Sequence, residues 1–455
     1  MSDASPSITF PVPYAAPERQ SWRAIARGLG NNALAGFPSR AFEEMVLARS
    51  FVGHRQILLN DPAGIHRVLI ENPGNYRRTA SIFRVLGPVV GDGLFLAEGD
   101  EWRRQRSAAA PAFAPRMMGP VAGHVARACD RLAGELAEAE GAEIDLYARL
   151  QLLALGIAAT SLFSLDLAGH GPELRAELQG YAAGIGRPSL LDFLLPRGWP
   201  TPRSWARRRF RRRWMARIAG LLAARLAQPL AEPPRDLFDM MAAATTDADR
   251  AGGRLVEQAA TMLAAGHETT AVALFWSFYI VASLPELQQR LAAEAAALDL
   301  SPAGAAAALP RLVVTRAVVD ETLRLYPPAF SVVRQAIAGD EADGIRIPPR
   351  AVVLIVPWIL HRHRLLWRDP DRFDPGRFLP GAAPPARLSY LPVGAGPRAC
   401  VGAQFALTET VLVLARLVRE FRIELAQDRP VLPLARITLQ PDCPPPFRLY
   451  RRGGA

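Results

Sequence analysis

A chain of 455 residues, half of them hydrophobic and 21% charged, has ample material for a large core, which excludes disorder as the default state. The net charge of +11 comes from 54 basic residues, all arginine, and no docking motif accompanies them, so we expect no nucleic-acid binding. Three cysteines without a CxxC pair exclude a disulfide framework and a four-cysteine zinc site.

The N-terminal stretch, Met1 to Arg23, is polar and has no apolar run long enough for a signal peptide or a membrane span. We therefore expect a cytoplasmic protein with no stable membrane anchor. No repeat, long linker or shift in composition divides the chain, so its length is compatible with one large domain or with several.

In chain order, the first elements are short β-like runs between about residues 50 and 75, such as Arg55 to Leu59, with a helix that opens at Asp61-Pro62. Residues 100–326 are mostly helical by their i, i+3, i+4 apolar spacing. From 327 to 380, runs such as Ala351 to Val356 alternate with proline-rich loops, and a last helix covers 402–421. The pattern predicts a mainly α fold with small β-sheets, in the α+β class.

One predicted helix, Arg254 to Leu284, has no proline and would be roughly 45 Å long, which predicts a central helix. It ends where Ser283 and Glu286 offer a capping box for the next helix. A further helix runs from about Pro310 to Tyr326, where two prolines stop it.

Trp102 and Arg106 lie four residues apart on a helix that Asp100 is expected to cap. The indole N–H and the guanidinium then point the same way, as a carboxylate site requires. An arginine stacked on a tryptophan at a solvated face is the alternative.

Residues 207–213 contain six arginines in seven positions, with Trp205, Phe210 and Trp214 interleaved. A membrane surface or a nucleic acid is one class of partner for such a segment. A solvated helix face is the ordinary alternative.

Ala265-Gly-His-Glu-Thr-Thr270 lies midway along the central helix. Glycine costs a helix about 1 kcal/mol relative to alanine, and threonine hydroxyls compete for backbone carbonyls, so helix propensity did not select these residues. Gly266 lets a helix open to a water or diatomic ligand, and Glu268 with Thr269 offers an acid and a hydroxyl for proton delivery. A packed crossing of small residues is the alternative.

Two other pairs say little alone. Glu321 and Arg324 are three apart on a helix, where such pairs are usually exposed and weak. His361 and His363 resemble a metal pair, but with no third ligand nearby we interpret them as surface or hydrogen-bonded histidines.

Cys400 follows a loop of glycines and prolines, Pro392 to Ala399, and precedes the last helix. A helix N-terminus stabilises a thiolate, glycines leave room for a flat ring, and Arg398 is placed to pair with an acidic substituent of that ring. Cys129 and Cys443 are interpreted as buried apolar thiols.

The same loop also fits the dinucleotide fingerprint GxGxxA over Gly394 to Ala399, with Glu424 downstream. Pro392 would interrupt the required strand, and no further βαβ units follow. We keep this interpretation as the weaker one.

Together these residues resemble the cytochrome P-450 family of haem-thiolate monooxygenases, and the likeness spans most of the chain in the expected order. The family's motifs W-x-x-x-R, A-G-x-[DE]-T-[TS], E-x-x-R, P-x-R-F and F-x-x-G-x-R-x-C-x-G correspond, in turn, to Trp102–Arg106, Ala265–Thr270, Glu321–Arg324, Pro375–Phe378 and Val393–Gly402. The resemblance implies one domain over residues 1–455, with the long central helix over a haem.

By resemblance, Cys400 is the axial ligand of the iron of haem b, iron protoporphyrin IX, and Glu268 and Thr269 deliver protons during oxygen activation. The haem propionates are expected to be held by Trp102, Arg106, Arg334 and Arg398. Further cofactor-binding positions are Ala265, Gly266, Thr269, Val393, Gly394 and Gly402. A structural triad is implied at Glu321, Arg324 and Arg377, and a substrate pocket at Leu94, Phe95, Ala265, Phe330 and Val332.

The implied reaction inserts one oxygen atom from O2 into a small apolar substrate, such as a fatty acid or terpenoid. Electrons are expected from an acidic ferredoxin or flavodoxin with its reductase, because the chain has about 50 residues after Cys400, too few for a fused reductase. The alternatives are a peroxide-driven haem-thiolate enzyme, which usually lacks the Glu–Thr pair, and a haem-binding sensor or scaffold. One position departs from the family pattern, since Val393 stands where phenylalanine is usual.

Overall fold

The computed structural model describes residues 8–12, 28, 31–51, 53–167, 169–228, 234–245, 253–427 and 429–453. Helices dominate, and the strands form small sheets, which confirms the predicted fold class. The helices are α2 (Pro62–His66), α3 (Ala80–Val90), α4 (Gly99–Ala109), α5 (Met118–Glu138), α6 (Leu146–Phe163), α7 (Gly171–Ala183), α8 (Leu190–Leu194), α9 (Ser204–Leu226), α10 (Leu237–Ala243), α12 (Arg254–Ala282), α13 (Pro285–Ala296), α14 (Ala305–Ala308), α15 (Val313–Leu325), α16 (Pro357–Leu360) and α17 (Ala403–Glu420).

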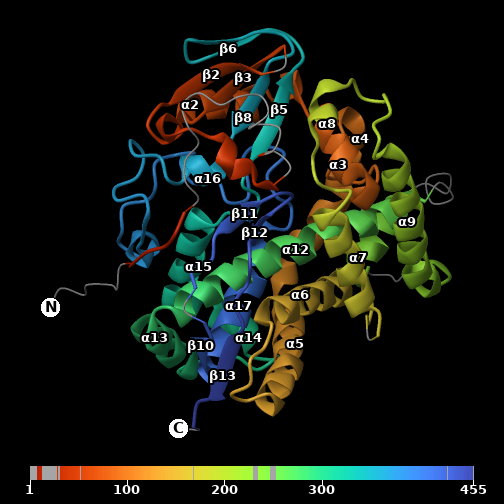
Figure 1. The fold of residues 1–455 in the computed structure, drawn as a ribbon. Helices are drawn as coiled ribbons and strands as arrows, with labels where there is room; N and C mark the ends of the chain where they lie inside the picture. The colour runs from red at the N-terminus through yellow and green to blue at the C-terminus, as the bar shows by residue number, and fades with distance from the viewer. Residues whose placement is uncertain are drawn as a thin grey trace.

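The central helix α12 crosses the middle of the molecule, between the largest sheet and the bundle that contains α5, α6 and α17 (Figure 1). Its C-terminal half is apolar on every face, and Phe275, Trp276 and Phe278 are completely buried. A helix that is hydrophobic all round must be enclosed by protein. The prediction of a central helix is therefore confirmed, with the end at Ala282 rather than Leu284.

The largest sheet has five strands in the order β2-β3-β8-β5-β4. The β3–β8 pair is parallel, and the other neighbours in this sheet are antiparallel. Four further sheets have two strands each: β1-β9, β6-β7, β10-β13 and β11-β12. The strands are β1 (Ile8–Thr9), β2 (Val46–Phe51), β3 (His54–Leu59), β4 (Tyr76–Arg77), β5 (Val332–Ala336), β6 (Asp340–Ala342), β7 (Ile345–Ile347), β8 (Val352–Ile355), β9 (Arg372–Phe373), β10 (Phe421–Leu425), β11 (Pro433–Ala435), β12 (Leu439–Pro441) and β13 (Phe447–Arg451).

The residues that cap the helix N-termini were predicted correctly for α2 and wrongly for α4 and α13. Asp61 caps α2 as expected, because its carboxylate accepts from the Gly64 N–H at 2.6 Å. The capping box at Ser283 is wrong, since the Ser283 hydroxyl donates to the Tyr279 carbonyl at 2.8 Å and so completes the last turn of α12. The Asp100 cap is also wrong, because α4 begins at Gly99. The predicted helix from Pro310 starts later, at Val313, after a separate short 3-10 turn.

Among the described residues, α6 is long and apolar enough to match a membrane span, and the bent pair α12 and α13 passes the same test together. In α6, 67% of the apolar window is buried, and the helix packs against α12 and α5. These are the properties of a core helix, and length with composition alone does not distinguish the two cases.

Candidate active site

The loop that carries Cys400 is closed by a hydrogen bond from the Cys400 N–H to the Val393 carbonyl, at 2.9 Å. Gly394 and Gly396 have φ of +75° and +72°, a region that favours glycine. A Cβ at Gly396 would also lie 2.1 Å from the Leu69 carbonyl oxygen, so the second glycine is required by a close approach of two backbones. This loop holds Cys400 just before α17, as the sequence predicts.

The thiol of Cys400 is accessible although protein surrounds it on most sides. Burial raises its pKa, while the Gly402 N–H and the Arg106 guanidinium act in the opposite direction. Such a thiol ionises when a cation binds directly to the sulfur, as a metal ion does. In these surroundings the neutral thiol of Cys400 is favoured over the free thiolate.

The dinucleotide interpretation of this loop is wrong. The residues before Gly394 form turns and coil instead of a strand, and the parallel pair of the large sheet, β3 and β8, lies elsewhere in the chain. The pyrophosphate site of that motif needs a strand that leads directly into the glycine loop. Cys443 is exposed, which corrects the expectation of a buried thiol, whereas Cys129 is buried as expected.

A group of arginines near Cys400 shares a single carboxylate. Arg78 and Arg398 both pair with Glu98, and the Arg398 guanidinium lies 4.6 Å from the centre of the Trp102 ring. Arg334 donates to the carbonyl of Val333, and burial, followed by the charges of Arg78 and Arg398, lowers its pKa to about 9. Three guanidinium groups against one acid leave an excess of positive charge that a bound anion would neutralise.

The side chains of Trp102 and Arg106 contact different partners. Trp102 lies beneath Arg398, whereas Arg106 donates to the Ala399 carbonyl at 2.9 Å, next to the cysteine. Arg78 and Glu98 were not predicted from the sequence. No motif marks either residue, and their partners lie far away along the chain.

The Ala265–Thr270 segment is an unbroken part of α12. Ala265 is exposed in the middle of this helix, and Gly266, Glu268 and Thr269 are half-buried. A Cβ at Gly266 would lie 3.8 Å from Ala158, an ordinary contact, so packing does not require glycine there. The Thr269 hydroxyl donates to the Ala265 carbonyl at 2.6 Å, one turn back.

Glu268 is held by three neutral donors. Its carboxylate accepts from the Tyr147 hydroxyl at 2.9 Å, from the Gln151 amide at 3.1 Å and from the Gln440 amide at 2.6 Å. Tyr147 and Gln151 lie one turn apart on α6, and Gln440 lies on β12. The Gln151 oxygen in turn accepts from Arg175 at 2.7 Å, so a residue of α7 is connected to Glu268 through one amide. None of these donors was identified from the sequence.

His267 is completely buried, and neither ring nitrogen has a hydrogen-bond partner among the described residues. Burial lowers its pKa, although the neighbouring Glu268 acts against that shift. The imidazole is therefore neutral at neutral pH.

Glu321 and Arg324 are both completely buried, unlike most pairs at this spacing. Two parallel bonds of 2.7 Å join them. Arg324 also donates to the carbonyls of His361 at 2.7 Å, Pro370 at 2.6 Å and Arg372 at 2.9 Å, and Arg377 lies 3.6 Å from Glu321. The structure thus brings together the three residues expected to form a triad.

The histidine pair is structural. The His361 Nε2 accepts from the Leu391 N–H at 2.7 Å, and its Nδ1 contacts the Arg324 carbonyl at 3.0 Å. In the part of the chain that the structure describes, no group of three or more potential metal-binding side chains occurs.

The expected substrate-pocket residues lie in different environments. Leu94 and Phe330 are buried, Val332 is half-buried on β5, and Phe95 is 41% exposed beneath the Arg78 guanidinium. Val332 and Arg334 are two apart on β5 and so share one face of that strand.

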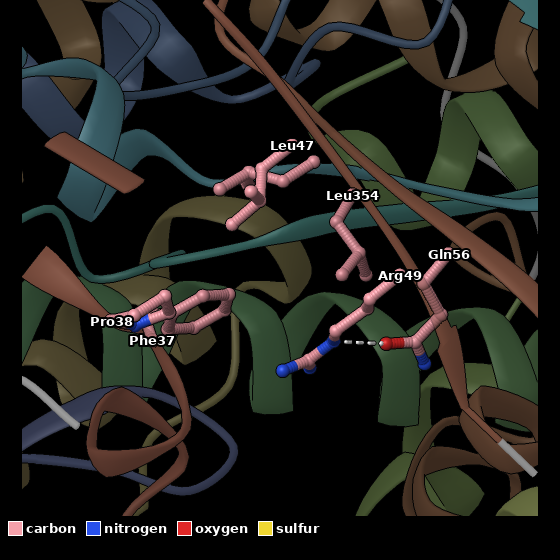
Figure 2. A pocket seen from close by; sticks show the side chains of 7 residues that line it. Phe37, Pro38, Leu47, Arg49, Gln56 and Leu354 are labelled. Carbon is pink, nitrogen blue, oxygen red and sulfur yellow. Dashed lines mark hydrogen bonds between the residues drawn. The ribbon is translucent and has the colours of Figure 1, made fainter. Parts of the chain in front are cut away.

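A small pocket lies at another place, on one face of the large sheet (Figure 2). The Arg49 Nε donates to the Gln56 side chain at 3.0 Å across its rim. None of its lining residues was predicted to belong to the active site: Phe37, Pro38, Leu47, Arg49, Gln56, Leu58 and Leu354.

Comparison with known proteins identifies the family. The family model of cytochrome P450 matches residues 41–443. Cyclooctatin synthase of Streptomyces melanosporofaciens is 31% identical over 80% of this chain and 79% of its own length. Pentalenene oxygenase of Streptomyces avermitilis is 29% identical over 85% and 83%.

Solved structures agree on the fold. The heme domain of cytochrome P450DA superposes with a TM-score of 0.80 at 21% identity, over 98% of this chain and 99% of that one. Cyanobacterial CYP120A1 with bound retinoic acid superposes with a TM-score of 0.76 at 23% identity, over 90% and 92%. The chain belongs to the cytochrome P450 family and is an oxidoreductase of that type.

Proposed function

We propose that this protein is a haem-thiolate monooxygenase that inserts one oxygen atom from O2 into a small apolar molecule, a terpenoid or a fatty acid. The observation that carries the proposal is the accessible Cys400 thiol beside arginines that lack enough carboxylates. The names of cyclooctatin synthase, cyclooctat-9-en-7-ol 5-monooxygenase and pentalenene oxygenase support a terpenoid as the first substrate class to test.

The residues present fit haem b. The porphyrin carries two carboxylates, which match the uncompensated charge of Arg78, Arg334 and Arg398, and Cys400 supplies the sulfur ligand. The indole N–H of Trp102 would donate to the same carboxylates. Arg106 donates to the Ala399 carbonyl and so holds the backbone next to the sulfur. When bound, the haem supplies redox-active iron whose thiolate ligand favours cleavage of the O–O bond.

The chain's own contribution to proton delivery is proposed to come from Glu268 and Thr269. The three donors around Glu268 hold its carboxylate turned toward α6 and β12, and the Gln151–Arg175 contact extends this network to α7. Thr269 is the next residue along α12, and its hydroxyl already donates within the helix, so the hydroxyl oxygen can accept a further hydrogen bond. A carboxylate and a hydroxyl in this order form a short proton path.

Thr269→Ala is the experiment that tests this function. We expect haem binding to stay intact. The fraction of reductant recovered as product should fall several-fold while the yield of peroxide rises, because proton delivery is disturbed. Product and peroxide are measured per NAD(P)H consumed in a reaction with surrogate redox partners.

Ser277→Ala is the matched control, because Ser277 makes the same kind of bond to the Ala273 carbonyl, at 2.8 Å, two turns further along α12. Equal coupling in Thr269→Ala and wild type would remove the role of Thr269. Haem-containing protein without any product from a panel of apolar substrates would instead indicate a sensor or scaffold.

Val393→Phe is expected to shift the haem reduction potential measurably. The Val393 carbonyl accepts from the Cys400 N–H, and Val393 lies where the family usually has phenylalanine. The larger phenylalanine side chain would shield the sulfur more than valine does. Val393→Ile is the control for size without an aromatic ring. Titrations that give the same potential for wild type and Val393→Phe would contradict the idea.

We propose that electrons come from an acidic ferredoxin or flavodoxin in the cytoplasm. The net charge of +11 favours an acidic partner, and attraction between exposed charges weakens as salt rises. The reduction rate should therefore fall between 50 and 500 mM NaCl, values chosen to shorten the screening length from above 10 Å toward a few Å. A rate independent of salt in stopped-flow measurements would exclude this type of docking.

A further inference from the structure

The arginine-rich segment around α9 has no part in the proposed chemistry, yet the structure gives it an unusual surface. Between Asp192 and Glu232 the chain has ten arginines and no acidic residue. Four of these arginines form ion pairs with acidic residues of the same chain. Arg207 is buried against Asp192, Arg211 pairs with Asp92 and Glu257, Arg217 with Glu173 and Glu177, and Arg225 with Asp236 and Asp239.

The other arginines of α9 face outward. Arg208, Arg209, Arg212 and Arg213 are exposed, and none forms an ion pair with the residues that the structure describes. Phe210, Trp214, Ile218 and Leu222 are buried on the opposite side of the helix. The interpretation of this segment as a solvated helix face is therefore wrong for Arg207, which is buried, and agrees with the exposure of the outward arginines. We call Arg208, Arg209, Arg212 and Arg213 the cationic face.

Large exposed apolar side chains occur on α9 and in the segment that precedes it. Trp199 and Trp205 are each 63% exposed, and Leu191 is 39% exposed. Trp205 lies one turn before Arg208 and Arg209, and the Arg209 guanidinium lies 5.7 Å from its ring centre. Exposed tryptophan and arginine side chains are typical of protein surfaces at a membrane interface, where the apolar ring lies among the lipid headgroups.

The loop that carries Trp199 is fixed in place. Arg84 of α3 donates to the carbonyls of Asp192 and Leu195 at 2.8 Å each, and also to that of Pro196. Arg197 lies 3.7 Å from the centre of the Phe83 ring. Figure 1 shows α9 at the edge of the molecule, where it packs against α3 and is joined by ion pairs to α7 and α8. Because the loop is already ordered, docking through it carries little additional entropic cost.

We propose that the cationic face, with Trp199, Trp205 and Leu191, docks the protein on an anionic lipid bilayer. The four arginines lie within about 8 Å along the helix, at 1.5 Å per residue, so they meet a flat anionic surface together. The aliphatic Leu191 favours a bilayer over a nucleic acid, where exposed aromatic rings would stack on bases and a leucine would have no partner. Docking is peripheral and reversible, and it requires no membrane-spanning segment.

The test uses purified holoenzyme and sucrose-loaded vesicles of phosphatidylcholine, with or without 30% phosphatidylglycerol. The protein is expected to sediment with the anionic vesicles, to sediment far less with the neutral ones, and to be released by salt. Replacing two arginines, Arg208→Gln with Arg212→Gln, should weaken binding by about 30-fold, at about fivefold for each arginine near an anionic surface.

The matched control is Arg127→Gln with Arg131→Gln, two exposed arginines four apart on α5, which should change binding less than twofold. Brominated lipids should quench part of the tryptophan fluorescence, and Trp199→Phe with Trp205→Phe should remove that quenching. Absence of sedimentation with anionic vesicles, or an equal loss in the control variant, overturns the proposal. Tighter binding of a single-stranded oligonucleotide through Arg208 and Arg212 would also overturn it, in favour of a nucleic-acid site.

Discussion

Cys400→Ser is expected to lower product formation by more than about 100-fold and to remove the red-shifted absorption band of the reduced, carbon-monoxide-treated protein. Changes to groups that merely support a metal ligand already cost 10- to 100-fold, and this substitution removes the ligand itself. Serine preserves the size of the side chain, and its backbone N–H still donates to Val393, so the loop should keep its shape.

Cys443→Ser is the control for the loss of a thiol, since Cys443 is also exposed but lies outside the loop. Haem content is measured separately from the spectrum, because a variant that retains haem without the shifted band shows a change of ligand rather than a loss of cofactor. A Cys400→Ser protein with the band intact would contradict the assignment of Cys400 as ligand and with it the proposed function.

Arg324→Ala is expected to lower the free energy of unfolding by about 3–5 kcal/mol, since it leaves the buried Glu321 carboxylate without its partner. Domains are stable by only about 5–15 kcal/mol, so this loss removes a large share of the total, and the midpoint of thermal unfolding and the yield of haem-bound protein should both fall. Soluble yield, haem content and thermal unfolding give the measurement. Arg316→Ala is the control, because the Arg316 side chain is 44% exposed in its pair with Asp320, and pairs with an exposed partner usually contribute about 0–1 kcal/mol.

Replacing both partners tests why the pair is present. A buried ion pair can often be exchanged for apolar residues without loss, but Arg324 also donates to three backbone carbonyls, of His361, Pro370 and Arg372. The double variant Glu321→Leu with Arg324→Met would leave these carbonyls unpaired, so it should stay unstable. A double variant as stable as wild type would show that the bonds to the carbonyls contribute little.

Candidate residues that are marked by their neighbours in the chain could be singled out from the sequence. Cys400 was found because its glycines, Arg398 and the following helix are contiguous, and the Ala265–Thr270 segment because it contradicts helix propensity. The central helix was likewise visible as a long run without proline. Local sequence also misled where two patterns compete, as at Ser283, whose hydroxyl bonds back into α12 instead of forward to the next helix.

Contacts between distant segments were not predictable. Arg78 and Arg398 share Glu98 across 20 and 300 residues of chain, and Gln440 reaches Glu268 across 172. The single-letter pattern at each of these positions is ordinary, and only the folded arrangement of α6, α12 and β12 brings the groups together. The burial of Glu321 and Arg324 was missed for the same reason, since their spacing alone is typical of an exposed pair.

The bond from Gln440 to Glu268 has a practical consequence for engineering. β11 and β12 form a hairpin near the end of the chain. Gln440 lies in the middle of β12, so a library that includes this position alters the carboxylate on α12 at the same time. On the proposed role of Glu268 in proton delivery, substitutions at Gln440 should waste reductant, and a library that keeps Gln440 constant avoids this effect.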